Sequence, residues 1–332
     1  MKDDQLALSP VLKAEERKPA TTMKRNGARR GRGLRQLATA FPFLAPNLIG
    51  FFLFTFFPVL ASIALSVTKW DLLTPPEFVG LENYANLIGF SFDQGRLQFN
   101  DPDFWKYVWN TIFLMGAIPL AMAGSLFLAI LLNGKFPGRS ILRSIYFLPS
   151  MCVPVAVYML WRWLLNPGTG LLNWVLSYVG IEGPDWLGST TWSKPALMLA
   201  GLWASVGGYN MILYLAGLQG IPGELYEAAK LDGAAPWHRF RYITWPLLAP
   251  TTFFITVTSI IAGLQGGFDA AYIMTNGGPA GSTTTIMFYI YNSAFQWMKM
   301  GYAAAMAWVL FTMVFAITLL NWRVGGRHAQ FF

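Results

Sequence analysis

Residues 224–234 read Glu-Leu-Tyr-Glu-Ala-Ala-Lys-Leu-Asp-Gly-Ala, and this polar stretch lies between the apolar runs Pro195–Gly223 and Tyr242–Phe268. Its residues favour a helix that ends near Gly233, and Pro236 is suited to the first turn of a second short helix. We therefore predict a helix–turn–helix between two membrane-spanning helices, placed where a soluble partner can reach it.

The first helix of this segment has signals at its beginning. Pro222 suits the first helical position, where its missing N–H costs nothing. Glu224 is then in the first turn, where its charge complements the helix dipole. Small Ala228 and Ala229 permit close approach by another protein. From these residues alone, an amphipathic connector that lies on the lipid is the alternative.

Six runs without Asp, Glu, Lys or Arg approach or exceed the length needed to cross a bilayer, about 20 residues of helix. The chain is 55% hydrophobic and 12% charged, whereas soluble proteins carry about 25% charged residues. The third run is short and can extend past Arg162 if that side chain reaches the interface. We predict an all-α membrane protein with six transmembrane helices. The runs are Gln36–Thr68, Tyr107–Gly134, Ser144–Trp161, Pro195–Gly223, Tyr242–Phe268 and Gly301–Trp322.

The basic residues indicate the orientation of the spans. Of the 24 Lys and Arg, 18 lie in the N-terminal tail, in the loops 134–143 and 224–241, and in the C-terminal tail. The positive-inside rule places these segments in the cytoplasm, so the basic charge predicts an orientation rather than a nucleic-acid partner. The expected parts are a flexible basic cytoplasmic tail (1–40), a six-helix transmembrane domain (41–325) with the loop 222–246, and a cytoplasmic C-tail (326–332).

Residues that form catalytic sites are scarce. His238 and His328 have no Cys, Asp or Glu at metal-ligand spacing, and Cys152 is the single cysteine. No phosphate-binding loop or nucleophile elbow occurs, and the spans lack the acids of an intramembrane enzyme or proton-coupled carrier. We predict a transport subunit that is not an enzyme, binds no metal or cofactor, and is powered by another protein. An intramembrane hydrolase or transferase and a channel are the alternatives.

The polar segment resembles the EAA loop of ABC importer permeases in the residues Glu227 to Ala234, Phe240, Ile243, Pro246 and Pro250. Other stretches resemble the sugar-permease branch, which contains the maltose-type MalF proteins. They are Phe78–Tyr84, Asn110-Thr111, Arg143–Pro149, Trp161–Pro167 and Thr275–Pro279. The resemblance covers roughly residues 40–325.

The resemblance implies a set of partners. A second permease forms a heterodimer with this chain in the bacterial inner membrane, and an extracytoplasmic binding protein delivers a carbohydrate. Two ATPase subunits bind ATP and Mg, and each receives an EAA helix–turn–helix in a cleft. The residues implied to couple this chain to its ATPase are Glu224, Glu227, Ala228, Ala229, Asp232 and Gly233.

Polar and aromatic residues in the fourth and fifth runs are candidates for a substrate pathway. Tyr209 lies 18 positions before Glu227, and it matches in register a tyrosine that contacts sugar in the maltose-type permease. The glycines Gly266 and Gly267 depart from an asparagine-rich stretch in that family and leave room for a larger substrate. For each single polar residue, helix packing is the alternative. The candidates are Trp203, Ser205, Tyr209, Asn210, Gln265, Gly267 and Asp269.

The expected substrate is an oligosaccharide, and two acidic alternatives stay open. Glycerol phosphate favours Arg or Lys in a cavity, and the spans contain neither. A partner permease or binding protein can supply that charge, for glycerol phosphate as for uronic oligosaccharides. The acidic segment Lys69–Lys106 either docks the binding protein or is solvated. In the segment 162–195, Trp186 and Trp192 fit an interfacial re-entrant piece.

Overall fold

The computed structural model describes residues 39, 41–93 and 96–329. The chain divides into two compact units, Met1–Leu60 and Ala61–Phe332. Apart from Thr39, the predicted flexible tail (1–40) lies outside the described residues.

The described part of the first unit is one apolar helix. It begins at Phe41, contains the π-helical turn η1 (Phe52–Phe56), and continues past the unit boundary to the end of α2 (Phe57–Ser66). It is 26 residues long, and none of the side chains in its most apolar window is buried in the chain. This length crosses a bilayer, so the helix is a membrane span.

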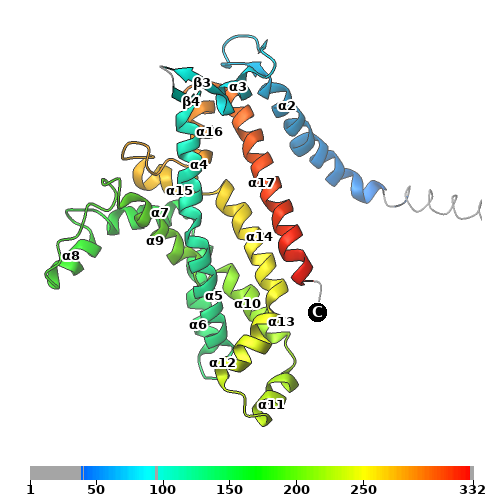
Figure 1. Cartoon of the computed structure of the whole chain (residues 1–332), viewed down its shortest axis with the longest axis vertical. Helices are drawn as coiled ribbons and strands as arrows, with labels where there is room; N and C mark the ends of the chain where they lie inside the picture. The colour runs from blue at the N-terminus through cyan, green and yellow to red at the C-terminus, as the bar shows by residue number, and fades with distance from the viewer. Residues whose placement is uncertain (1–38, 40, 94–95, 330–332) are drawn as a thin grey trace, which may run out of the picture. The chain divides into compact units, whose positions relative to one another are not determined.

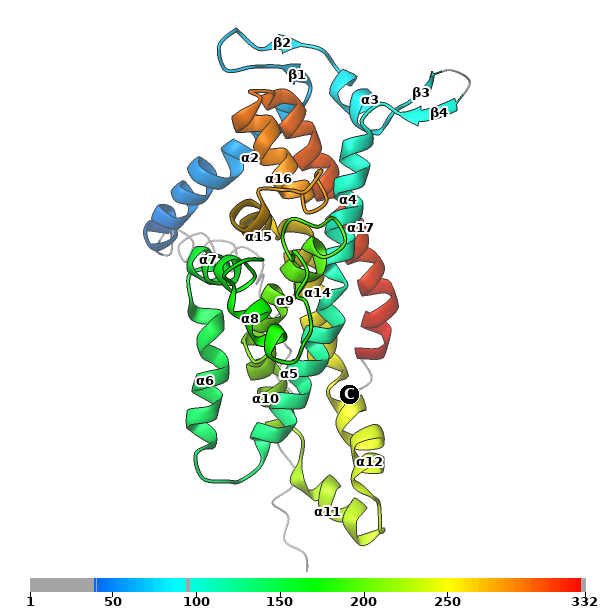
Figure 2. The same ribbon diagram turned by 90° about the vertical axis from the view of Figure 1, so that its left-hand side faces the viewer.

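The second unit is almost entirely helical, with two short hairpins near its beginning (Figures 1 and 2). The hairpin strands are β1 (Thr68–Lys69), β2 (Glu77–Phe78), β3 (Phe90–Asp93) and β4 (Arg96–Phe99). The helices up to the polar segment are α3 (Glu82–Ile88), α4 (Pro102–Met115), α5 (Ala117–Asn133), α6 (Arg139–Met151), α7 (Pro154–Leu164), α8 (Leu171–Tyr178), α9 (Ser193–Ser205) and α10 (Tyr209–Gln219). The remaining helices are α11 (Gly223–Leu231), α12 (Pro236–Arg239), η2 (Phe240–Thr244), α13 (Trp245–Leu247), α14 (Ala249–Gln265), α15 (Phe268–Ala270), η3 (Ala271–Thr275), α16 (Ile286–Tyr291), η4 (Asn292–Gln296) and α17 (Met300–Ala329).

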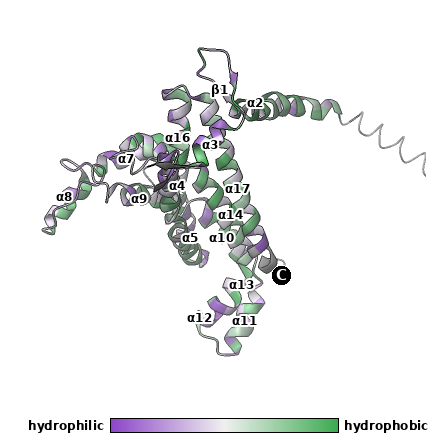
Figure 3. Cartoon of the chain, turned by 45° about the horizontal axis from the view of Figure 1, so that its top comes forward, coloured by the Kyte–Doolittle hydropathy of each residue, from purple (hydrophilic) through white to green (hydrophobic). Residues whose placement is uncertain are grey.

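The prediction of six spans is confirmed when each bent helix pair is one span. The helices Phe41–Ser66, Pro102–Asn133 and Met300–Arg323 are long and apolar enough to cross by themselves. The other three spans are pairs bent by 93° between α6 and α7, by 44° between α9 and α10, and by 63° at the start of α14. Figure 3 shows hydrophobic residues along most of these helices. The last helix, α17, continues into the predicted C-tail as far as Ala329.

The third span differs most from a straight helix. The run Ser144–Trp161 is broken at Cys152 and Val153, where the backbone is extended, and α7 restarts with Pro154 in its first turn. A residue before proline is kept out of the helical region by the proline ring, and this explains the break. Beyond it the span passes Arg162 as expected, and this side chain donates to the Ile273 carbonyl at 3.2 Å.

Three clusters of buried side chains hold the second unit together. The first joins α4, α14, α16 and α17 around Phe104 and Met306. The second joins α5, α10 and the start of α14 around Met211 and Leu248. The third joins Leu165, at the end of α7, to α9 and η3 around Ala200. Each cluster connects segments from both halves of the sequence, so the bent spans are held by packing between helices.

The two hairpins and α3 lie at one end of the second unit, and α11 and α12 lie at the other (Figures 1 and 2). In the first hairpin Thr68 pairs with Phe78, and in the second Phe90 pairs with Phe99. The Asn83 amide donates to the carbonyls of Ser66 and Thr68, both at 2.9 Å, and fixes α3 to the end of α2. We call these the hairpin end and the helix–turn–helix end.

Candidate functional site

The predicted helix–turn–helix is confirmed as α11, a four-residue turn and α12. Gly233 has φ +76°, a left-handed conformation that side chains disfavour. Its N–H donates to the Lys230 carbonyl at 3.1 Å, and the Ala234 N–H donates to the Ala229 carbonyl at 2.8 Å. These two bonds are the Schellman pattern that closes a helix end. The glycine therefore sets the angle at which the chain leaves α11.

The position predicted for Pro222 is wrong by one residue. Pro222 has ψ 129° and precedes the helix as its N-cap, with Gly223 as the first helical residue. The Pro222 carbonyl accepts the Leu225 N–H at 3.3 Å, so proline here caps α11. Glu224 is in the first turn as expected.

The residues predicted to meet an ATPase lie on an open surface. Leu231 is 89% exposed and Trp237 is 68% exposed, although both are large and apolar. The hydroxyls of Tyr226 and Thr244 are 2.9 Å apart and tie α11 to η2. Five of the six predicted residues are exposed, and Ala229 is half-buried: the exposed ones are Glu224, Glu227, Ala228, Asp232 and Gly233.

A hollow of about 510 Å³ lies between the turn, α12 and η2, and we call it the loop hollow. Small residues leave this space open, and its other walls are formed by His238, Arg239, Tyr242 and Ile243. A hollow with small and aromatic walls can receive a side chain of a partner. The residues on its small-residue side are Ala229, Gly233, Ala234 and Ala235.

The breaks in the third and fourth spans lie against each other. A Cβ on Gly207 would stand 3.0 Å from the Tyr146 Cβ, and a Cβ on Gly208 would stand 3.0 Å from the Ser150 Cβ. Gly207 also has φ +86°. The two glycines thus let α6 approach the point where α9 ends and α10 begins. Paired helix breaks inside the membrane are a usual place for binding sites in transporters.

Two predicted pathway residues flank these breaks with aromatic neighbours. Tyr209 is the first residue of α10, is 72% exposed, and has its ring 6.3 Å from that of Phe147. Trp203, near the end of α9, is exposed and makes an edge contact with Trp161, with 6.2 Å between centroids. Aromatic faces of this kind stack on sugar rings.

The other pathway candidates are more dispersed. The Ser205 hydroxyl donates to the Gly201 carbonyl at 2.8 Å within its own helix. Asn210 is half-buried at the start of α10. Gln265 ends α14, Asp269 lies in α15, and both are exposed.

The glycines of the fifth span have backbone roles. Gly267 has φ +80°, and a Cβ there would stand 2.9 Å from the Thr285 Cγ2. A Cβ on Gly266 would stand 2.6 Å from the Ala262 carbonyl oxygen. Both glycines line a small hollow of about 160 Å³ between α4, α9 and α14, which also includes Tyr158. They therefore permit the break after α14 as well as leaving space beside it.

The motif Asn110-Thr111 holds a loop between α15 and α16. The Asn110 amide donates to the carbonyls of Gly281 and Thr284 at 2.9 and 3.0 Å. The Thr111 hydroxyl accepts the Ile286 N–H at 3.0 Å and so supports the beginning of α16. Both polar side chains are buried. Asn110 and Thr111 therefore have a structural role, which explains them without contact with a substrate.

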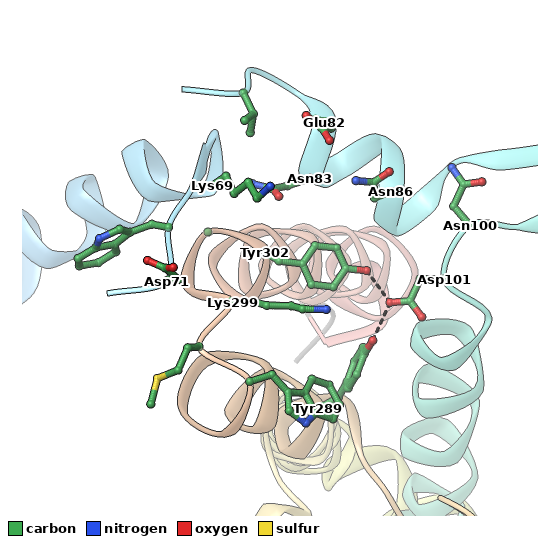
Figure 4. A pocket seen from close by; sticks show the side chains of 15 residues that line it. Lys69, Asp71, Glu82, Asn83, Asn86, Asn100, Asp101, Tyr289, Lys299 and Tyr302 are labelled. Carbon is green, nitrogen blue, oxygen red and sulfur yellow. Dashed lines mark hydrogen bonds between the residues drawn. The ribbon is translucent and has the colours of Figure 1, made fainter. Parts of the chain in front are cut away.

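A pocket of about 540 Å³ opens at the hairpin end, and we call it the hairpin pocket (Figure 4). Aromatic and polar side chains alternate on its walls, which come from the first hairpin, α3, α16 and α17. Figure 4 shows Asn86 of α3 above the pocket and Lys299 below it. The charged residues on its walls are Lys69, Asp71, Glu82, Asp101 and Lys299.

Asp101 joins three helices at the edge of this pocket. One carboxylate oxygen accepts the Phe104 N–H at 3.0 Å and caps α4. The other accepts the hydroxyl of Tyr289 of α16 at 2.8 Å and that of Tyr302 of α17 (Figure 4). Burial, together with the bond to Asp101, raises the pKa of Tyr289. No local sequence signal marks this cluster, because Tyr289 and Tyr302 lie 188 and 201 residues from Asp101.

Within residues 39, 41–93 and 96–329, no group of three or more His, Cys, Asp or Glu is arranged to hold a metal ion.

Comparisons with known proteins place these features in a family. The family described as "Binding-protein-dependent transport system inner membrane component" matches residues 117–324. The lactose transport system permease protein LacF of Rhizobium radiobacter is 37% identical over 287 residues, which are 84% of this chain and 91% of LacF. The probable ABC transporter permease protein YesP of Bacillus subtilis is 35% identical over 318 residues, 93% of this chain and 98% of YesP.

A solved structure has the same fold. One chain of a bacterial ABC transporter involved in the import of the acidic polysaccharide alginate aligns with a TM-score of 0.76 and 25% identity, covering 90% of this chain and 99% of that one. The family match spans more than half of the chain and includes the helix–turn–helix, both paired breaks and α17. The chain therefore belongs to the inner membrane components of binding-protein-dependent transport systems, the permeases of ABC importers.

Proposed function

We propose that this chain is the permease subunit of an ATP-driven importer for a carbohydrate, with an oligosaccharide as the substrate. The observation that carries the proposal is the exposed helix–turn–helix, in which Gly233 ends the first helix and the loop hollow lies beside the turn. The similarity to LacF, whose name is that of a lactose permease, supports a sugar as the cargo. The chain itself is a transport subunit and not an enzyme.

The helix–turn–helix is the contact with an ATPase subunit in this proposal. To shift a two-state equilibrium from 1:99 to 99:1 takes about 5.5 kcal/mol of differential binding, and one exposed ion pair contributes only about 0–1 kcal/mol. A packed surface is therefore needed. The loop hollow, with exposed Leu231 and Trp237 on the same segment, supplies apolar area for it. Glu227 then fixes how the helix–turn–helix is aligned on the ATPase surface. ATP and Mg are bound by the ATPase subunits.

A second permease is the expected partner within the membrane. The helix Phe41–Ser66 is 26 residues long and apolar, and it offers a surface of span length to a heterodimer partner. The positive-inside rule places both termini in the cytoplasm of a bacterial cell.

With that orientation the hairpin end faces the binding protein. The hairpin pocket has both signs of charge and exposed amides on its walls, which suits a polar protein contact. The substrate then passes from this end toward the paired breaks, where Tyr209 and Trp203 are exposed.

A uronic oligosaccharide is the second candidate for the cargo. The aligned transporter imports an acidic polysaccharide, and this favours the second candidate specifically. A neutral oligosaccharide stays the first candidate because the apolar runs contain no Arg or Lys. Glycerol phosphate has no observation in its favour.

The test is the ATPase activity of the complex reconstituted with its neighbouring ATPase, second permease and binding protein, measured with neutral oligosaccharides, uronic oligosaccharides and glycerol phosphate. We expect stimulation by a neutral oligosaccharide and its loss in Glu227→Lys. Glu182→Lys, the same charge reversal at an exposed site outside the helix–turn–helix, is the control and should keep the stimulation. Equal stimulation in both variants would refute the assigned contact, and stimulation by glycerol phosphate alone would refute the carbohydrate.

A further inference from the structure

A second hollow lies at the helix–turn–helix end, and Arg239 of α12 lines both this hollow and the loop hollow. It measures about 550 Å³ and lies between the ends of α5 and α10 and the segment α11–η2. Its rim at α5 is Asn133 and Gly134, the last residue and C-cap of that span. We call it the basic hollow, and it lies where two spans reach the membrane surface.

The walls of the basic hollow carry two cations and no carboxylate. Lys230 of α11 and Arg239 of α12 both line it. Within the described ranges, neither side chain has an ion-pair partner, and the buried Nε of Arg239 has no hydrogen-bond partner. A buried guanidinium nitrogen without an acceptor is costly. An anion from outside the chain would meet both cations of this hollow.

The remaining walls describe the shape of that anion. Ile130, Leu218 and Phe240 are apolar, whereas Asn133 and the two cations provide donors. The Tyr226 hydroxyl on the wall is already paired with Thr244. Lys and Arg together match a phosphate group. The volume is larger than phosphate needs, and the apolar wall suits the glycerol and first methylenes of a lipid.

We propose that the basic hollow binds the phosphate headgroup of an anionic phospholipid of the surrounding leaflet. Basic pockets at the cytoplasmic ends of membrane helices recognise such headgroups. The bound phosphate bridges α11 and α12 to the end of α5, so it holds the helix–turn–helix in one position relative to the spans. The leaflet follows from the proposed orientation, whereas the binding itself does not depend on the transported substrate.

The test uses the full-length chain purified in detergent, with thermal unfolding followed during titration. The probes are dioctanoyl phosphatidylglycerol, dioctanoyl phosphatidylcholine and inorganic phosphate. We expect a saturable rise of Tm with phosphatidylglycerol only. Lys230→Gln and Arg239→Gln should each weaken the apparent affinity about tenfold, because each removes a charge-assisted hydrogen bond.

Arg241→Gln is the matched control, since Arg241 lies on the same segment, stacks over the Tyr242 ring and does not line the hollow. Its Tm should rise with phosphatidylglycerol as that of the original chain does. Lys230 is on an exposed helix surface, so Lys230→Gln keeps the test decisive if Arg239→Gln fails to fold. An equal response to phosphatidylcholine, a response to inorganic phosphate, no response to phosphatidylglycerol, or an equal loss in Arg241→Gln would each overturn the lipid site.

Discussion

The two ends of the second unit are built from contacts of very different sequence separation. At the helix–turn–helix end, the Schellman bonds and the Tyr226–Thr244 contact connect residues at most 18 positions apart. At the hairpin end, Asp101 connects to Tyr289 and Tyr302 across 188 and 201 positions. The bonds of the helix–turn–helix end are local and do not depend on how the spans are arranged, whereas those of the hairpin end join distant spans. A docking element that is built from local contacts can therefore keep its shape when the spans move.

The largest expected effect is at the hairpin end. Asp101→Ala removes the cap of α4 and the acceptor of two phenols, which should lower the free energy of unfolding by roughly 2–4 kcal/mol. Thermal unfolding in detergent measures this. Asp103→Ala, an exposed carboxylate in the same helical turn, should cost far less. Equal losses in the two variants would mean that the contact between the three helices contributes nothing.

At the other end, Gly233→Val should act on coupling more than on the fold. A β-branched residue at φ +76° costs roughly 1–2 kcal/mol locally and changes the exit angle of α11. We expect normal membrane insertion with substrate-stimulated ATPase reduced at least about tenfold. Gly223→Ala is the control, since a Cβ there meets nothing within 4 Å. Intact coupling in Gly233→Val would contradict the idea that the exit angle of α11 determines the contact with the ATPase.

Between the two ends, Tyr209→Ala tests whether the paired breaks contact the substrate. Loss of one aromatic contact to the substrate should raise the transport KM about fivefold, which corresponds to about 1 kcal/mol. Uptake by reconstituted vesicles measures it. Tyr178→Ala, at an exposed tyrosine of α8, is the control and should leave KM unchanged. An unchanged KM in Tyr209→Ala at equal expression would remove Tyr209 from the pathway.

The smallest effect is a pH dependence confined to the hairpin end. Because burial and the Asp101 bond raise the pKa of Tyr289, the folded state holds the phenolic proton more tightly than the unfolded chain. This stability is fully present below the usual tyrosine pKa of about 10 and is lost as the pH rises above it. Unfolding followed from pH 9 to 11 (about one unit on either side of that value) should show a shallower decline in Tyr289→Phe. Tyr178→Phe should decline like the original chain.

Several elements of this protein follow from the sequence by itself. The apolar runs predict the spans because length and lack of charge are local properties. The helix–turn–helix is predictable because Gly233 and Pro236 act on their own backbone, and the misplacement of Pro222 by one position reflects the two capping roles that proline can take. Proline at 154 is likewise a local signal for the break in the third span.

Only the tertiary structure decided the rest. The bend angles of 93°, 44° and 63° depend on which helices pack together. So does the meeting of Gly207 with Tyr146, and the gathering of Asp101, Tyr289 and Tyr302. The basic hollow joins the end of α5 to α11 and α12, about a hundred residues later in the chain. Such contacts have no local signature in the sequence, because their free energy arises only when distant segments pack against each other.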